Sequence, residues 1–146
     1  MKSDRTLACV AGLLCLLGAS IGVGVTFAAA DKPEDLAQTA AEAWLKTVDA
    51  GRYDDSWSAS AGLFQGAVTK EQWRQAAASA RGPLGDLVGR KVKSRQYTTT
   101  LPGAPAGMYV LLKFDAVYKA RAAAVETVTV MVDPDGAWRV FGYFIK

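Results

Sequence analysis

Histidine is absent from the 146 residues of this chain, and cysteine occurs only twice, at Cys9 and Cys15. Histidine is the commonest metal ligand and general base near neutral pH. Both cysteines precede Ala30, so a domain that begins after Ala30 contains no thiol and no disulfide. These absences exclude Cys-His and Ser-His catalysis from that domain. We therefore expect neither a metal nor a cofactor.

The chain also lacks a large surplus of either charge, because 17 Lys and Arg residues face 14 Asp and Glu residues. Without residues 1–30, which hold Lys2, Asp4 and Arg5, the remaining chain has fifteen basic and thirteen acidic side chains. Nucleic-acid-binding proteins usually show a marked basic surplus. We therefore expect no nucleic-acid partner.

Charged residues are missing from the stretch TLACVAGLLCLLGASIGVGVTFAAA, residues 6–30, which follows a basic start. A basic start, an apolar centre and a small-residue end are typical of a secretory signal peptide. This pattern predicts cleavage after the small residues Ala28 to Ala30, so that the mature chain begins at Asp31.

An uncleaved membrane anchor is the alternative, because about 20 apolar residues suffice to span a bilayer. Residues 1–30 are therefore predicted as a signal peptide or an anchor, and residues 31–146 as a single domain. The protein is expected in the periplasm or secreted, or else held at the inner membrane through residues 6–30. In the anchored form, this segment would be its one contact with the membrane.

The first half of the predicted domain has helical signals. Asp31 followed by Glu34 has the spacing of a capping box and predicts a first helix, which Gly51 would end. A second, short helix fits YDDSWSASA, residues 53–61.

A third helix is expected to open at Thr69, where Gln72 can complete a capping box. Gly82 in a left-handed conformation and Pro83 after it would end this helix.

The second half of the domain, from Val88 onward, is rich in β-branched and aromatic residues with turn signals between runs of about ten residues. The predicted strands are VGRKVKSRQYTTTL, MYVLLKFDAVYK and the two runs on either side of DPDG. We therefore predict an α+β domain in which about three helices pack on a curved four-stranded antiparallel sheet, either cone-like or open.

The DPDG turn fixes the expected register of the last two strands. If residues 134–136 form a three-residue loop, Val132 pairs with Trp138, and Glu126 pairs with Phe144. Alternate residues share a face. This register places Glu126 on the core-facing side.

A carboxylate among apolar neighbours needs an explanation, because buried charge is costly unless paired. Glu126 either pairs with Lys113 or Lys119 in a structural role or lines a pocket. Tyr143 would lie on the opposite face from Glu126.

The first predicted strand contains a basic run, Arg90, Lys91, Lys93 and Arg95. Lys91, Lys93 and Arg95 alternate onto one face with Tyr97, which predicts a solvated sheet face rather than an anion site. Such a face could form a homodimer, although its charge opposes self-association.

Several stretches of the chain together resemble the bacterial domain-of-unknown-function family 4019: WLKTVDAGRYDDSW, VTKEQWRQ, RGPLG, YTTTLPGAPAGMYVLLKF and ETVTVMVDPDGAWRVFGYFIK. A helix followed by DAGRYDDSW is more loosely similar to the opening of nuclear-transport-factor-2-like cone folds. These resemblances imply a curved antiparallel sheet wrapped by helices around a cavity. They supply no known chemistry.

Three functional interpretations remain open. The leading one is a non-catalytic module of the cell envelope that binds a small ligand or an envelope protein. Its candidate cavity or rim residues are Trp57, Trp73, Tyr97, Glu126 and Tyr143. The second is a small hydrolase or isomerase with Glu126 as general base in an apolar cavity. The third is a purely structural domain of the envelope.

Overall fold

The computed structural model describes residues 31–146. The predicted signal peptide or anchor, with its cleavage residues Ala28 and Ala30, lies outside the described residues. The elements follow one another as α1 (Pro33–Asp49), α2 (Tyr53–Ser58), α3 (Gly62–Ala67), α4 (Lys70–Arg81), the 3-10 turn η1 (Gly82–Leu84), β1 (Leu87–Thr98), β2 (Tyr109–Tyr118), β3 (Arg121–Val132) and β4 (Trp138–Ile145).

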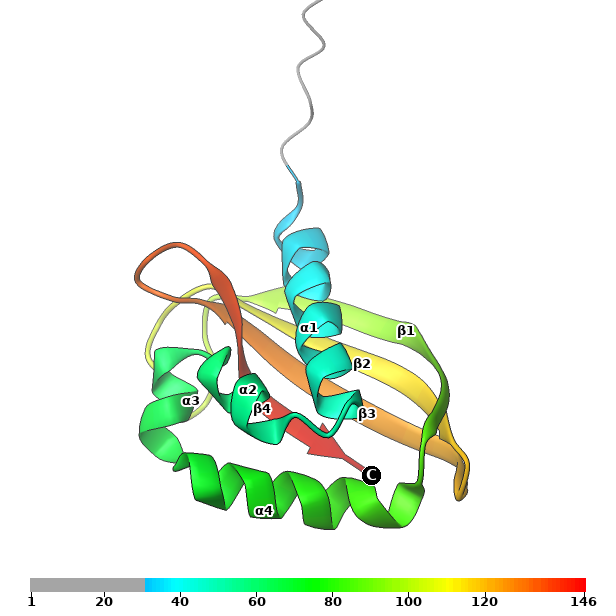
Figure 1. The fold of residues 1–146 in the computed structure, drawn as a ribbon. Helices are drawn as coiled ribbons and strands as arrows, with labels where there is room; N and C mark the ends of the chain where they lie inside the picture. Colours follow the sequence, from blue (N-terminus) through cyan, green and yellow to red (C-terminus); the bar gives the residue numbers. More distant parts are fainter. Residues whose placement is uncertain (1–30) are drawn as a thin grey trace, which may run out of the picture.

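The four strands form one antiparallel meander in the order β1-β2-β3-β4. Figure 1 shows α1 crossing one face of the sheet, with α2, α3 and α4 on that same side. The prediction of an α+β domain with helices on a four-stranded antiparallel sheet is confirmed, and the sheet is open. We call the face covered by helices the helix-covered face and the other the open face.

The main core lies between the helices and the sheet. Its largest contributions come from aromatic and aliphatic side chains that are almost fully buried: Trp44, Leu45, Val48, Trp73, Val110, Leu112, Phe114, Val128, Val130 and Val140. Burying each such side chain stabilises the fold by about 1.5–3 kcal/mol. Within the described residues, the buried members of this cluster run from Ala37 on α1 to Val140 on β4, so the core joins the first helix to the last strand.

The helix ends agree only in part with the sequence signals. Thr69 and Gln72 form the predicted capping box at α4, and Gly51 has the positive φ of 71° expected after α1. The predicted Asp31 cap is wrong, because Lys32 is the N-cap residue and makes no side-chain capping bond. Pro33 instead opens α1 with a φ suited to the first helical turn.

The end of α4 also differs from the prediction. Gly82 is right-handed, with φ −53°, and the chain continues into η1. The left-handed residue is Gly85, with φ +72°. Helix α3 was not predicted, since its sequence GLFQGA contains two glycines and its N-cap Ala61 makes no side-chain capping bond.

The pairing of β3 with β4 contains an irregularity that changes the register. The predicted pair Val132–Trp138 is present, but the pairing shifts by one residue between Thr129 and Val130. Glu126 therefore pairs with Ile145, and the predicted pair with Phe144 is wrong. Phe144 is 60% exposed as a result.

A second irregularity divides the basic run of β1. Lys91 pairs with Asp115 on the open face, whereas Arg95 pairs with the fully buried Leu112. Arg95 donates a 2.5 Å hydrogen bond to Asp35 on α1. The prediction that Lys91 and Arg95 share a face is therefore wrong, because the pairing shifts between Val92 and Ser94.

Candidate functional site

Glu126 on β3 is fully buried, on the helix-covered face as predicted. Its Oε1 accepts hydrogen bonds from Arg81 Nη1 at 2.9 Å, from the Tyr118 hydroxyl at 2.7 Å and from the Tyr143 hydroxyl at 2.6 Å. Its Oε2 accepts a hydrogen bond from Arg90 Nε. Both carboxylate oxygens are therefore occupied by donors from the protein.

Asp49, the last residue of α1, accepts from the same two arginines. Arg90 donates to it in a bidentate manner, with Nη1 at 2.8 Å and Nη2 at 3.0 Å, and Arg81 Nη2 also pairs with it. Two guanidinium groups thus balance two carboxylates. We call the six residues Asp49, Arg81, Arg90, Tyr118, Glu126 and Tyr143 the ionic cluster.

The ionic cluster joins six elements, α1, α4 and all four strands, and local features place its members. The capping box sets where α4 begins, and Arg81 continues the stripe of Trp73 and Ala77, all three of which are buried. The shift in β4 pairing brings Tyr143 opposite Val128, on the same face as Glu126. The guanidinium of Arg81 lies over the ring of Tyr118, 5.1 Å from its centroid.

The ionisation of the cluster follows from its burial and its charges. Burial and the hydrogen bond to Glu126 raise the pKa of Tyr118 to about 12. Burial and the charge of Glu126 raise the pKa of Tyr143 further. Burial opposes ionisation of Asp49, but its hydrogen bonds and charge contacts with Arg90 and Arg81 outweigh this and lower its pKa.

This arrangement is suited to structural pairing rather than to proton transfer. A general base needs a lone pair within hydrogen-bond reach of the substrate proton. Each Glu126 oxygen already accepts from a neighbouring side chain, and the carboxylate is shielded from solvent. The predicted lysine partners are wrong: Lys119 pairs with Asp86 at 2.7 Å, and Lys113 lies on the open face opposite Thr127.

The five candidate cavity residues do not form one site. Trp73 and Tyr143 pack edge to face, 6.1 Å between ring centroids, and both line a shallow hollow of about 180 Å³ beside β4. Trp57 lies apart, where its indole N–H donates to the Val68 carbonyl at 2.9 Å. Tyr97 is the last residue but one of β1 and is 38% exposed.

Sequence reasoning did not assign Asp49, Arg81, Arg90 or Tyr118 to a site. One signal was available for Arg81, which continues the apolar stripe of α4 at the four-residue spacing of Trp73 and Ala77. A basic residue on a core-facing stripe calls for a buried acidic partner.

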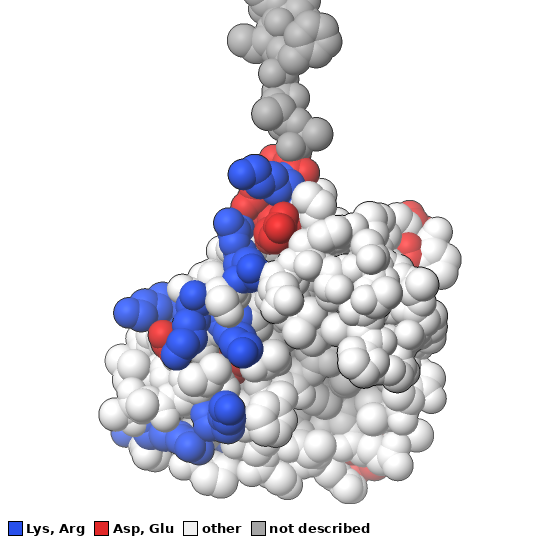
Figure 2. All heavy atoms as spheres, turned by 180° about the vertical axis from the view of Figure 1, so that it is seen from behind, with Lys and Arg blue, Asp and Glu red and all other residues white. Residues whose placement is uncertain are grey.

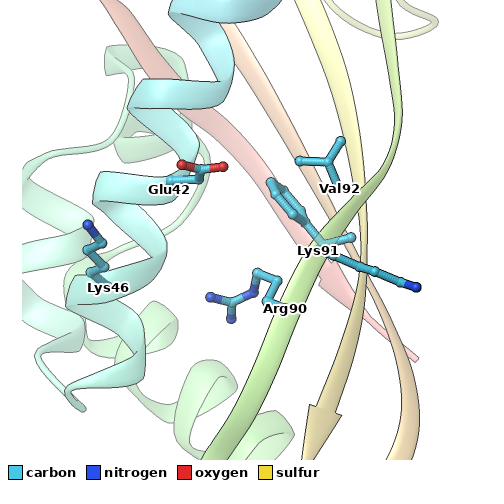
Figure 3. Close-up of a pocket in the computed structure, with 6 residues that line it drawn as sticks. Glu42, Lys46, Arg90, Lys91 and Val92 are labelled. Atoms are coloured by element: carbon cyan, nitrogen blue, oxygen red, sulfur yellow. The ribbon is translucent and has the colours of Figure 1, made fainter.

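A groove lies between α1 and β1, directly beside the ionic cluster. It has a volume of about 270 Å³ and is lined by Glu42, Lys46, Arg90, Lys91, Val92 and Phe114. In Figure 3 the Glu42 carboxylate and the Arg90 guanidinium point toward the space between α1 and β1, whereas the Lys91 amine points away from α1. We call this feature the α1–β1 groove.

The polar groups of the α1–β1 groove keep some hydrogen-bonding capacity. Arg90 has two N–H groups on Nη1, and one of them donates to Asp49. The other has no acceptor among residues 31–146. Glu42 is exposed and accepts a 2.8 Å hydrogen bond from Gln38 at Oε1. The groove therefore offers one buried donor and one acceptor at its rim, above the apolar side chains of Val92 and Phe114.

Two further findings concern the described part of the chain. Among residues 31–146, no group of three or more acidic, cysteine or histidine side chains is placed to hold a metal ion. Within the same residues, no helix has the length and apolar character needed to cross a membrane.

The fold and the buried cluster define a small α+β domain in which helices are tied to an open antiparallel sheet by paired charges. Residues 40–143 match the family model described as "Protein of unknown function (DUF4019)", and the chain belongs to this family. Neither the curated proteins nor the solved structures contain a match to this chain.

Proposed function

We propose that the protein is an exported, non-catalytic binding module of the cell envelope, and that the α1–β1 groove is its small-ligand site. The observation that carries this proposal is the composition of the groove, where the apolar side chains of Val92 and Phe114 lie beside the charged side chains of Arg90 and Glu42. Ligand sites are usually concave and mostly apolar, with a few placed polar groups. Export rests on the uncharged run of residues 6–30.

The chemistry of the groove favours a small ligand with an apolar body and a polar end. The polar end would accept a hydrogen bond from Arg90 Nη1 and donate one to the Glu42 carboxylate, as an amide or an alcohol can. The volume of about 270 Å³ lies just below the usual range for drug-sized ligands, about 300–1,000 Å³. The ligand is accordingly a small one.

The ionic cluster supports binding by holding Arg90 in place. Its guanidinium is fixed by Asp49 and Glu126 before any ligand arrives, so little side-chain entropy is lost on binding. The cluster is thus the scaffold of the groove rather than its reactive part.

The alternative function, a hydrolase or isomerase with Glu126 as general base, would require a substrate to displace one of four donors from a buried carboxylate. No observation in residues 31–146 favours such a displacement. A binding role for the domain needs no such rearrangement.

The groove is tested with two single substitutions on β1, one inside the groove and one outside it as a control. Val92→Phe places a larger side chain in the groove, and Val88→Phe makes the same change at a residue that is 66% exposed outside it. Residues 31–146 and both variants would be purified from the periplasm and analysed by native mass spectrometry, and amide shifts would be followed during titration with small aliphatic amides and alcohols.

The proposal predicts that a bound mass, or amide shifts at Glu42, Arg90 and Val92, appears with the parent chain and with Val88→Phe but not with Val92→Phe. Shifts that survive Val92→Phe would refute the groove as the site. A bound envelope protein instead of a small mass, or a dimer mass, would replace the small-ligand role by a protein-binding one.

A further inference from the structure

The charges of the domain are divided between its two layers. Residues 31–74, which form the first helices, carry eight acidic and five basic side chains. Residues 87–121, which form β1, β2 and their hairpins, carry seven basic side chains and a single acid, Asp115. The small overall charge therefore conceals a strongly basic part of the sheet.

The basic side chains lie together on the surface. Figure 2, which looks onto the open face, shows Lys and Arg gathered along one side, and the β1 strand runs along this side. We call this surface the basic face; its residues are Lys91, Lys93, Lys113, Lys119 and Arg121.

Two of these charges are paired and three are not. Lys93 pairs with Asp115 at 2.9 Å, and Lys119 pairs with Asp86 at 2.7 Å. Lys91, Lys113 and Arg121 have no carboxylate partner within residues 31–146. The basic face therefore presents a net surplus of three positive charges to whatever lies against it.

A hollow interrupts the basic face between Lys91 and the β2–β3 hairpin. It has a volume of about 430 Å³, and its lining includes Gly89, Ala122 and Ala123, whose side chains are absent or small. Val117, which is 42% exposed, also lines it. Arg90, Lys91 and Asp115 line the hollow as well, and Asp115 is paired with Lys93, so positive charge prevails around its aliphatic part. Apolar surface bordered by basic side chains is typical of membrane-surface sites.

We propose that the basic face docks on a bilayer that contains anionic phospholipids. Charge complementarity is the first argument, since each Lys or Arg near an anionic membrane surface strengthens binding about fivefold. The spread of the charges is the second. They are distributed over two strands and a hairpin instead of converging on one point, which suits a surface of many headgroups better than a single phosphate.

The sequence before α1 agrees with this partner. The uncharged residues 6–30 end two residues before Lys32, and α1 begins at Pro33. If that segment anchors the chain, the domain is held beside a bilayer, and even a weak contact is favoured by the high local concentration.

The test uses residues 31–146, the predicted mature chain, which contains the hydrophobic core between the helices and the sheet. Sedimentation with vesicles of phosphatidylcholine is compared with sedimentation with vesicles in which a third of the lipid is phosphatidylglycerol. We expect binding to the anionic vesicles alone, lost as ionic strength rises to about 0.1 M, where the Debye length is about 10 Å. Equal binding to both vesicles, or no binding to either, would overturn the proposal.

Matched variants identify the surface. Lys91→Gln with Lys113→Gln removes two unpaired charges from the basic face and should weaken binding about 25-fold. Arg52→Gln with Lys70→Gln removes two charges from the helical layer and should leave binding unchanged. Circular dichroism melting of both double variants shows whether they remain folded. An equal loss in the two double variants would overturn the assignment of the basic face.

Two soluble competitors separate the bilayer from other anions. Inorganic phosphate at the same ionic strength should not displace the chain from vesicles beyond the effect of sodium chloride. Displacement by phosphate at lower concentration would mean an isolated phosphate site, and tighter binding to a duplex DNA than to anionic vesicles would mean a nucleic-acid surface. Either result would overturn the membrane proposal.

Discussion

Tyr143 on β4 donates a 2.6 Å hydrogen bond to the Oε1 atom of Glu126 on β3. The two side chains meet because the β3–β4 pairing shifts by one residue between Thr129 and Val130. The same shift leaves Phe144 exposed on the open face. One irregularity of the sheet thus adds a donor to the buried carboxylate and removes an aromatic ring from the core.

The first prediction concerns the charge of Glu126. Glu126→Gln should lower the free energy of unfolding by about 3–5 kcal/mol, because it leaves two buried guanidinium groups with one carboxylate between them. The new amide N–H₂ would also face N–H donors of Arg81 or Arg90. Urea denaturation followed by tryptophan fluorescence measures this loss.

Asp86→Asn is the control for that measurement. Asp86 also pairs with a cation, Lys119, but both side chains are largely exposed. Exposed ion pairs contribute little to the free energy of unfolding. The urea midpoint of Asp86→Asn should therefore equal that of the parent chain. If Glu126→Gln unfolds at the same urea concentration as the parent chain, the ionic cluster does not stabilise the fold.

The second prediction is a loss of stability in alkaline solution. The pKa of Tyr118 is raised from its ordinary value of 10.0 to about 12 by burial and by the hydrogen bond to Glu126. The folded chain thus keeps a proton that the unfolded chain releases. Its contribution to the free energy of unfolding is therefore complete below pH 10. As the pH rises from 10 toward 12, the free energy of unfolding falls by about 2–3 kcal/mol because of this one group.

The measurement for the alkaline transition is a phenolate absorbance titration combined with melting at each pH. Tyr118 should ionise late, and Tyr143 later still, since burial and the charge of Glu126 raise its pKa too. Tyr143→Phe should remove one late-titrating group, whereas Tyr97→Phe, at an exposed position, should leave both. Simultaneous ionisation of all five tyrosines in the folded chain would contradict this account.

The third prediction concerns the start of α4, which carries Arg81 to the ionic cluster. Thr69 accepts a hydrogen bond from the Gln72 backbone N–H at 3.2 Å, and Gln72 accepts one from the Thr69 backbone N–H at 2.9 Å. Thr69→Ala should therefore lower the free energy of unfolding by about 1 kcal/mol.

Thr39→Ala is the control, because the same substitution at this position should not lower the free energy of unfolding. Thr39 is exposed within α1, where its hydroxyl bonds to the Asp35 carbonyl of the preceding turn. Alanine has the higher helix propensity at such a position, so this variant should be as stable as the parent or slightly more so. If both substitutions lowered the free energy of unfolding equally, the capping box would contribute no more to stability than an ordinary hydroxyl within a helix.

The sequence alone determined the order and type of most elements of this domain. Hydrophobic periodicity, the Thr69–Gln72 box and the DPDG turn act over a few residues, so they can be read without the rest of the chain. Gly136 adopts φ +84°, and the Asp133 N–H donates to the Ala137 carbonyl at 2.9 Å, as the turn requires. The resemblance to family 4019 is also confirmed, because the model of that family matches residues 40–143.

Tertiary structure decided which residues meet at Glu126. Arg81, Arg90 and Asp49 lie 45, 36 and 77 positions from it along the chain, and no local pattern connects them. The sequence also did not predict the shifts in the β3–β4 and β1–β2 pairings. The alternation of side chains between the two faces of a sheet predicts facing residues only where the pairing register is unbroken. A buried carboxylate must be neutralised, which the sequence implied; the sheet register and the packing of α1 and α4 determined which cations neutralise it.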